Sequence, residues 1–231
     1  MNKPSVVIPL SILIGGAIVA FAVYATLSSG EVSTGSGNAA LITPVSAQDH
    51  IYGNPAAPVK IIEYADFDCE YCKQFDTTMR SVMAEFGASG EVAWIFRDFP
   101  ITELHPNASH AAEAAECVAQ VAGNDAYWRF SAALFAGQPV DPSDYLSLAK
   151  AAGADPTAVG TCEENGSSTV DAIIDADSAN ARAIGAQGTP SSVLEAPGAP
   201  PVVINGAWPY AAVEQAIQQA LQSISSSTTP S

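Results

Sequence analysis

The stretch "VKIIEYADFDCEYCKQF", residues 59–75, joins two kinds of sequence pattern. Its first half belongs to a short apolar run without helical spacing, which predicts a buried strand over residues 57–67. Beyond Cys69, apolar side chains recur every three or four residues, which predicts one face of a helix that ends near Gly87. Cys69 and Cys72 therefore lie at a strand-to-helix junction, with Cys69 at the start of the helix.

Two cysteines at this spacing have three candidate uses. As a zinc site they supply two of the roughly four ligands that zinc takes, and His50, His105 and His110 show no ligand pattern to complete the set. As a structural staple they close a loop too short to remove much unfolded-state entropy. Redox chemistry fits the position best, because the free amides and the dipole of a helix start lower a thiol pKa. We expect Cys69 to attack, Cys72 to resolve the mixed disulfide, and no metal or cofactor to be needed.

The remaining pattern surrounds a helical block with strands. A second strand is predicted over residues 91–99, and about 80 residues of mostly helical pattern follow it. Two short strands, 191–196 and 201–206, flank a turn, and a last helix begins near Pro209. A βαβ unit followed by a hairpin and a helix predicts an α/β fold with a small mixed sheet covered by helices. The helical block is expected to be a separate inserted lobe.

Residues 6–27 form an uncharged apolar run that predicts a membrane-spanning helix. Only Lys3 and the terminal amine precede this run, and Glu31 is the first charge after it, so the N-terminus is expected in the cytoplasm. A cleaved signal peptide is the alternative, but its apolar region is normally about 7–15 residues long. The best cleavage pattern, at residues 45–47, lies far downstream. We expect residues 1–27 to be a cytoplasmic stub and a single-pass anchor in the cell membrane.

The rest of the chain divides into three parts. Residues 28–48 are small, polar and rich in Gly and Ser, which predicts a flexible linker. The extracytoplasmic domain spans residues 49–222 and contains the helical insertion at about 103–186. Residues 223–231 are expected to be a disordered tail.

The charge of the chain restricts its partners. The net charge is −16, from 24 acidic and 8 basic residues. A nucleic acid is excluded as a partner, because phosphate binding needs a basic surface. Anionic lipid should also repel the domain, so the anchor alone would hold it at the membrane. We expect the protein to be a monomer.

The four cysteines of an exported chain indicate disulfide bonds. Four cysteines allow three pairings, and the close spacing of Cys69 and Cys72 favours that pair together with Cys117–Cys162. Two alternatives stay open for Cys117 and Cys162: they are two free buried thiols, or they form a second redox-active pair.

Four segments together resemble the DsbA-like branch of the thioredoxin superfamily, a group of extracytoplasmic thiol oxidoreductases. The resemblance covers about residues 49–222 and implies a thioredoxin fold with the inserted helical lobe that marks this branch. The segments are "VKIIEYADFDCEYCKQF" (59–75), "VAWIFRDFPI" (92–101), "GTPSSV" (188–193) and "VVINGAWPY" (202–210).

The resemblance also implies roles for particular residues. Thr189 and Pro190 match the loop whose proline is cis in this superfamily, and they would present backbone to a substrate chain near the CxxC motif. Glu63 takes the place of a buried acid that passes protons to or from Cys72, whereas the residue pattern alone leaves it open that Glu63 is a solvated strand residue. Some members carry a second disulfide in the helical lobe, which agrees with pairing of Cys117 and Cys162.

The two residues inside the motif, Glu70 and Tyr71, bear on its redox poise. A carboxylate beside Cys69 should raise the pKa of that thiol. The strong oxidases of the family have Pro-His at these positions, and this chain departs from them. The single domain on a membrane tether still favours an oxidase, because related isomerases usually add a dimerisation domain.

We therefore expect an enzyme that introduces disulfides into exported proteins by exchange at Cys69 and Cys72. Its substrates would be thiols of exported proteins, and the resemblance implies a quinone-linked membrane partner that reoxidises it. One alternative is a reductase or isomerase that uses the same cysteines. Another is a non-catalytic, membrane-tethered binding module or chaperone, which should tolerate loss of Cys69.

The apolar run of residues 6–27 leads to a prediction about topology. The expressed protein should stay with membranes after carbonate washing, and external protease should release a soluble domain by cutting within residues 28–48. Fractionation with N-terminal sequencing of the product checks this. A secreted product that starts near residue 26 or 48 would show that the segment is a cleaved signal peptide.

Overall fold

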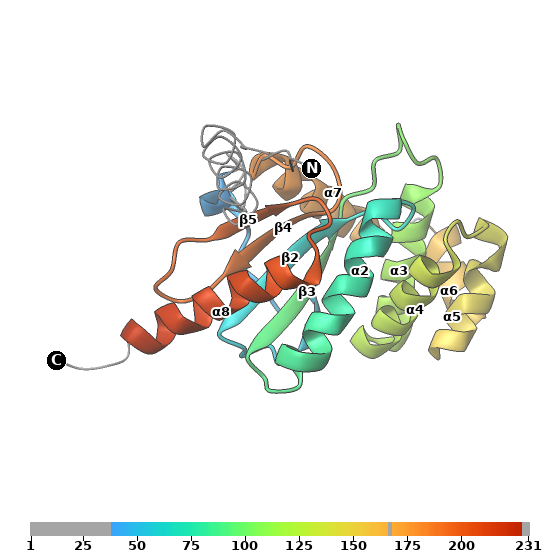
Figure 1. The fold of residues 1–231 in the computed structure, drawn as a ribbon. Coiled ribbons are helices and arrows are strands. Elements are labelled where there is room, and N and C mark those ends of the chain that lie inside the picture. The colour runs from blue at the N-terminus through green and yellow to red at the C-terminus, as the bar shows by residue number, and fades with distance from the viewer. Residues whose placement is uncertain (1–37, 166–167, 228–231) are drawn as a thin grey trace, which may run out of the picture. The chain divides into compact units, whose positions relative to one another are not determined.

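The computed structural model describes residues 38–165 and 168–227, which contain a five-stranded mixed sheet (Figure 1). The strand order is β1-β3-β2-β4-β5. The two central strands β2 and β3 are parallel, and every other neighbouring pair is antiparallel. The strands are β1 (His50–Gly53), β2 (Val59–Ala65), β3 (Val92–Asp98), β4 (Ser191–Glu195) and β5 (Val202–Asn205).

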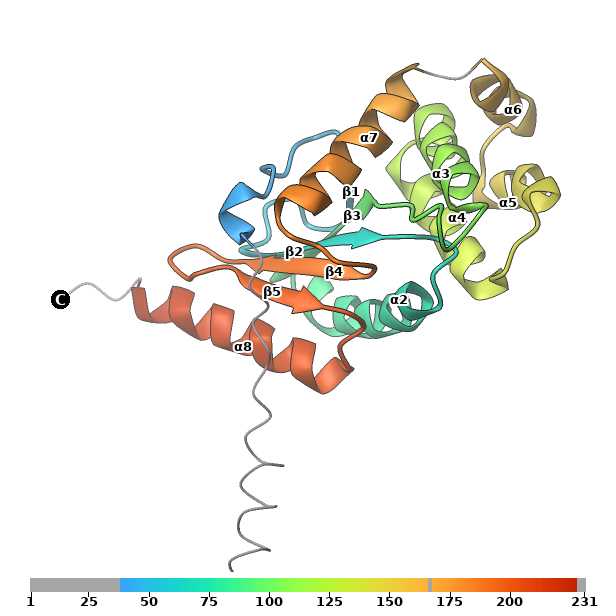
Figure 2. The same cartoon turned by 90° about the horizontal axis from the view of Figure 1, so that it is seen from above.

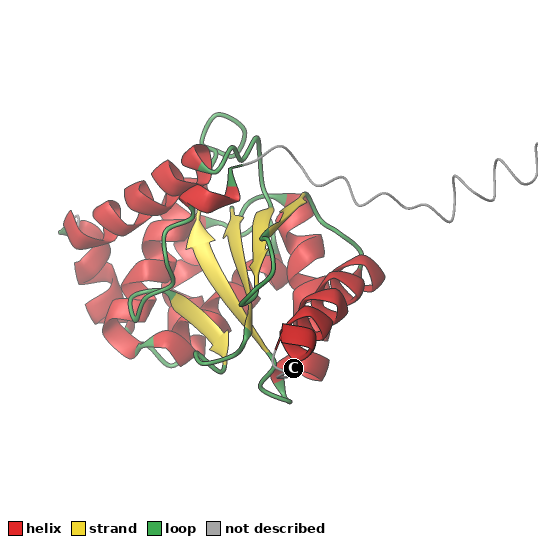
Figure 3. Cartoon of the chain, turned by 90° about the vertical axis from the view of Figure 1, so that its left-hand side faces the viewer, coloured by secondary structure: helices red, strands yellow, loops and turns green. Residues whose placement is uncertain are grey.

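Helices cover both faces of this sheet, as Figures 2 and 3 show. The helices α2 and α8 pack on one face, α7 packs on the other, and α3 to α6 lie beyond the β1 side of the sheet. The helices are α2 (Glu70–Val82), α3 (Ala108–Ala122), α4 (Asn124–Gly137), α5 (Tyr145–Ala152), α6 (Pro156–Glu164), α7 (Ser168–Ala183) and α8 (Tyr210–Ser227). Short helical turns are η1 (Ala39–Leu41), the π-helical η2 (Met83–Gly87) and η3 (Pro142–Asp144).

The central strand β2 is paired along both edges, by β3 and β4, and is buried on both faces by the helices that pack on the sheet. Ile61 and Ala65 belong to the core under α2 and α8, whereas Ile62 and Tyr64 pack under α7. Side chains alternate between the faces of a strand, so Glu63 points to the α2 side. This strand therefore delivers one carboxylate into the core beneath the helix that follows it.

The four predicted strands and the helix after Cys69 are confirmed, with small shifts at their ends. The strand β1 was missed, because four residues carry too little pattern and its order comes from pairing with β3. The prediction of a separate helical lobe is only partly right. Side chains of α3 and α4, such as Cys117 and Phe135, share one continuous core with the sheet, and α7 returns to cover its second face.

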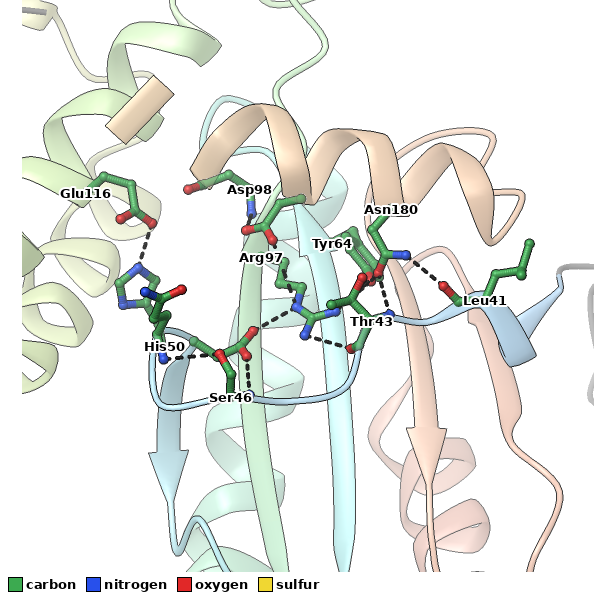
Figure 4. A network of polar contacts seen from close by, with 12 residues as sticks. Leu41, Thr43, Ser46, His50, Tyr64, Arg97, Asp98, Glu116 and Asn180 are labelled. Atoms are coloured by element: carbon green, nitrogen blue, oxygen red, sulfur yellow. Dashed lines mark hydrogen bonds and ion pairs between the residues drawn. The ribbon is translucent and has the colours of Figure 1, made fainter. Parts of the chain in front are cut away.

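The prediction of a flexible linker is wrong for residues 38–48, which are held against β3 and α7 (Figure 4). Arg97 donates to the Thr43 carbonyl at 2.9 Å and to Asp49 at 2.8 Å. Asn180 accepts from the Thr43 amide at 2.9 Å and donates to the Leu41 carbonyl at 2.8 Å. A small, polar sequence does not reveal these partners, because they lie far away along the chain.

The ends of the domain differ from expectation in one further respect. The helix α8 continues to Ser227, so residues 223–227 of the expected disordered tail are helical. The expected anchor, residues 6–27, lies outside the described residues. Between residues 38 and 227, leaving out 166–167, no helix is long and apolar enough to span a membrane.

A disulfide joins Cys117 in α3 to Cys162 in α6. It ties two helices of the inserted block across a sequence separation of 45 residues. Closing a loop of this length removes entropy from the unfolded chain, with an upper value of about 4 kcal/mol.

Replacing both of these cysteines by alanine should therefore lower the free energy of unfolding by about 2–4 kcal/mol. Urea denaturation of the variant beside the wild type measures the loss. Peptide mapping without reduction should recover Cys117 linked to Cys162 in the wild-type protein. An unchanged unfolding midpoint, or free thiols at both positions under oxidising conditions, would contradict the prediction.

Candidate active site

Cys69 caps the start of α2. Its backbone is extended, with φ −81° and ψ 122°, and its carbonyl accepts the first helical bond from Lys73 at 3.1 Å. Its amide donates to the Asp66 carbonyl at 3.1 Å, which closes the turn between β2 and the helix. Cys72 lies one turn further in and is completely buried. Both are free thiols, so the structure represents the dithiol form of the motif.

A loop that lies 120 residues further along the chain contacts the start of this helix. The Thr189–Pro190 peptide bond is cis, and it directly precedes β4. Since β4 pairs with β2, with Ser191 opposite Tyr64, this loop is brought beside the turn that carries the motif. The Cys69 sulfur lies 3.4 Å from the Thr189 carbonyl oxygen, to which its protonated form can donate. The sheet therefore places backbone of the loop directly against the outer sulfur.

The environment of Cys69 favours its thiolate. The pKa of Cys69 is lowered from 9.0 to about 5, chiefly by a hydrogen bond from the Cys72 thiol. Burial opposes this, but the side chain of Thr189 and the backbone amides of Cys72 and Tyr71 add to the lowering. These amides are the free donors of the first helical turn, as expected for a sulfur at a helix start. Cys69 is thus ionised at neutral pH.

Cys72 has the opposite character. Its pKa is raised well above 9.0, first by burial, then by its hydrogen bond to Cys69 and by the negative charges of Cys69 and Glu63. The Asp66 amide donates to its sulfur at 3.5 Å and partly offsets this rise in the pKa. The motif therefore pairs a thiolate with a thiol, which is the arrangement that thiol–disulfide exchange uses.

Glu63 is fully buried beneath the motif, so the alternative of a solvated strand residue is wrong. Burial raises its pKa from 4.5 to about 8, although a hydrogen bond from the Trp94 side chain opposes this rise. The Trp94 indole donates to one carboxyl oxygen at 2.8 Å. Its other oxygen has no hydrogen-bond partner among the described residues. At neutral pH the carboxyl group is mostly protonated and can donate or accept a proton.

The side chains of Glu70 and Tyr71 point outward. Both residues are exposed, and 63% of Tyr71 is accessible to solvent. The low pKa of Cys69 is set by hydrogen bonds rather than by the Glu70 charge, which water screens at this position. The expected effect of Glu70 on the pKa is thus overcome by the helix start itself.

A cavity of about 510 Å³ opens beside the first turns of α2. Its lining includes Asp68 and Lys73 on one side and Gln138 on the other. It adjoins the motif and is large enough for a side chain of a bound polypeptide. Within residues 38–165 and 168–227, no group of three or more His, Cys, Asp or Glu side chains could hold a metal ion.

Asp66 and His105 belong to the same neighbourhood, although the sequence patterns assigned neither of them to the chemistry. The Asp66 carboxylate is completely buried and lies 2.9 Å from Nδ1 of His105. The only local signal was an acidic residue three positions before Cys69, at the end of a strand. His105 gave no signal, because it lies 39 residues further along the chain.

The model of the thioredoxin family matches residues 46–196 of this chain. Among solved structures, oxidised BdbD from Bacillus subtilis is 24% identical with a TM-score of 0.67, and the match covers 78% of this chain and 97% of that one. A thioredoxin-like oxidoreductase from Silicibacter pomeroyi DSS-3 is 27% identical with a TM-score of 0.63, over 77% and 94% of the two chains.

One curated relative is named as an ion antiporter rather than as a redox protein. The Na(+)/H(+) antiporter NhaA 3 of Salinispora tropica is 38% identical over 112 residues, which is 48% of this chain but 16% of the antiporter. This chain thus spans about a sixth of the length of that relative, and the similarity does not extend to the remainder of the antiporter.

The hydrogen bond between the two cysteines leads to a prediction. Cys72→Ala should raise the pKa of Cys69 by about one unit or more, because the thiolate loses its strongest donor. Cys72→Ser is the matched variant, and it should raise this pKa less because its hydroxyl can still donate. Ultraviolet thiolate absorbance followed against pH measures both. Equal pKa values for the two variants and the wild type would show that the Cys72 hydrogen bond does not set the acidity.

Proposed function

The chain belongs to the thioredoxin family, and on this premise we propose that it is a DsbA-like thiol:disulfide oxidoreductase that introduces disulfides into exported proteins. One observation carries the proposal: Cys69 is a low-pKa sulfur at the start of α2, with buried Cys72 one turn behind it and the Thr189 backbone beside it. A low thiolate pKa stabilises the reduced motif and so makes its disulfide a better oxidant.

The exchange takes place in two steps. A substrate thiolate attacks the Cys69 sulfur of the Cys69–Cys72 disulfide, the S–S bond breaks, and Cys72 leaves as a thiolate that takes up a proton. A second substrate thiolate attacks the substrate sulfur of the resulting mixed disulfide, and Cys69 leaves as a thiolate. Two electrons pass from the substrate dithiol to the motif, and the substrate gains one disulfide.

Glu63 is the proton donor to Cys72 in this proposal. Its carboxyl group is largely protonated at neutral pH, and in its ionised form it raises the pKa of Cys72. Proton transfer to Cys72 as it leaves avoids a second buried negative charge beneath α2. In the reverse direction the same carboxylate would take the proton from Cys72, so that Cys72 can attack the mixed disulfide.

The cis-proline loop is the docking site for the substrate backbone. The Thr189 carbonyl oxygen lies 3.4 Å from the Cys69 sulfur, so a substrate chain bonded to Cys69 must run past Thr189 and Pro190. Main-chain contacts there would hold many different sequences, as a broad-range oxidase requires. The side chains of Glu70 and Tyr71, exposed at the rim, would contact the incoming chain.

The setting of the enzyme follows from the same proposal. Among the reported structures, the protein from Silicibacter pomeroyi is named a thioredoxin-like oxidoreductase, and BdbD was solved in an oxidised form. Residues 6–27 would tether the domain to the outer side of the cell membrane, where exported chains emerge. There a quinone-linked membrane partner would take the two electrons from the dithiol and restore the disulfide.

Trapping of intermediates tests the proposed roles of the two cysteines. Cys72→Ser should accumulate mixed disulfides between Cys69 and exported proteins, because no internal thiol remains to release them. Cys69→Ser should form few such adducts and should abolish oxidation of a reduced test protein. Non-reducing gels with mass spectrometry of the adducts give the measurement.

The outcomes separate the candidate activities. Trapping by Cys69→Ser but not by Cys72→Ser would reverse the assignment of attacking and resolving sulfur. A motif with a low reduction potential in a glutathione titration would indicate a reductase instead of an oxidase. Unaltered substrate binding and unaltered phenotype in Cys69→Ser would favour a non-catalytic binding module.

A further inference from the structure

Asp66 connects the CxxC motif to a second loop through both its backbone and its side chain. Its amide donates to the Cys72 sulfur at 3.5 Å, and its carbonyl accepts from the Cys69 amide at 3.1 Å. One carboxylate oxygen accepts from the Asp68 amide at 2.8 Å. The other accepts from the Ile101 amide at 2.8 Å. Through these hydrogen bonds the buried carboxylate holds both loops in place.

The second loop, residues 101–105, forms a tight turn that returns to the same carboxylate. The amides of Leu104 and His105 donate to the Ile101 carbonyl at 3.0 and 2.9 Å. Nδ1 of His105 then lies 2.9 Å from Oδ2 of Asp66, the oxygen that also receives Ile101. His105 is therefore held by its backbone amide and by its imidazole ring, beside the turn that carries Cys69.

The charges around this imidazole are almost all negative. Asp66, Asp68 and the Cys69 sulfur face it, and Glu103 lies on its own loop. Burial alone would lower the pKa of His105, but Asp66, Cys69 and Asp68 together raise it above 6.5. The charged residues in the first turn of α2 are Glu70 and Lys73, and the Lys73 ammonium is directed to the Gln138 carbonyl at 3.4 Å.

We propose that the imidazolium of His105, held in place by Asp66, is a cation that stabilises the Cys69 thiolate and so tunes the redox poise of the motif. This inference rests on the proposed function in one respect, since it names a group that adjusts the sulfur of that reaction. The motif itself contains no basic residue between its cysteines. A histidine from a distant loop supplies the positive charge instead.

The sign of the pH dependence follows from linkage. His105 stabilises the thiolate only while the imidazole is protonated, so its contribution is present above the pKa of Cys69, about 5, and is lost as the pH rises through the raised pKa of His105. Oxidation of the motif removes the thiolate charge, and the pKa of His105 should fall. By reciprocity, protonated His105 lowers the pKa of Cys69 by the same amount by which the Cys69 thiolate raises the pKa of His105.

The first test uses the unaltered protein. NMR titration of the His105 imidazole should give a higher pKa in the reduced than in the oxidised state, by about 0.3–1 unit for a partly exposed pair. Equal pKa values in the two redox states would overturn the proposal. No substitution is involved, so a folding defect cannot hide the result.

The second test compares variants by thiolate absorbance. His105→Gln keeps a hydrogen-bond donor for Asp66 but removes the charge, and it should raise the pKa of Cys69 by about the same 0.3–1 unit. His105→Lys should restore much of the effect. His110→Gln, which removes an exposed imidazole in α3, is the matched control and should leave the pKa unchanged. Indistinguishable values for His105→Gln and His110→Gln would also overturn the proposal.

Neither test needs a substrate, so the inference and the proposed function can fail separately. Redox-dependent titration of His105 without any oxidation of test proteins would leave the inference standing and refute the oxidase. Oxidase activity with a redox-independent His105 would do the opposite. A glutathione titration of His105→Gln connects the two, since its disulfide should be a weaker oxidant than that of the wild type.

Discussion

The pairing of β2 with both β3 and β4 is the constraint on which the site depends. The pairing covers both edges of the strand, helices cover both of its faces, and the strand ends at Ala65. The chain then turns through Asp66, and the Cys69 amide closes that turn. The free amides of α2 converge on the sulfur of the residue that begins the helix, while β4 presents Thr189 to it from the neighbouring strand. The low pKa of Cys69, to which the Cys72 thiol contributes most, therefore depends on the helix that begins just after β2 ends.

Two buried carboxylates near this turn differ because their partners differ. Glu63 has one indole donor, and desolvation keeps it largely protonated near neutral pH. Asp66 is equally buried but receives two backbone amides and an imidazole, which compensate its charge. One acid can therefore carry a proton, and the other fixes geometry. The position of each along the strand and turn, rather than its chemical type, decides which task it can perform.

The chain has few positive groups, and three of them pair with carboxylates at structurally important positions. Arg97 organises the segment that precedes β1 through Asp49 and Thr43 (Figure 4). Arg80 is held by Asp76 within α2. His105 lies against Asp66 beside the motif. Each of these cations is placed by a buried or half-buried carboxylate, so at these three places the negative charge is compensated locally.

The features that could be predicted from the amino-acid sequence are those that depend on residues close together along the chain. The change from an apolar run to helical spacing located the junction at Cys69, and the order of strands and helices gave the sheet and its insertion. Tertiary structure decided what depends on residues far apart: the pairing that orders β1, the packing of residues 38–48, and the contact of Cys69 with Thr189. It also decided that Glu63 is buried and that His105 meets Asp66. Periodicity reports only the local face that a residue occupies, whereas burial, pKa and ion pairing are properties of the surroundings that the whole fold assembles.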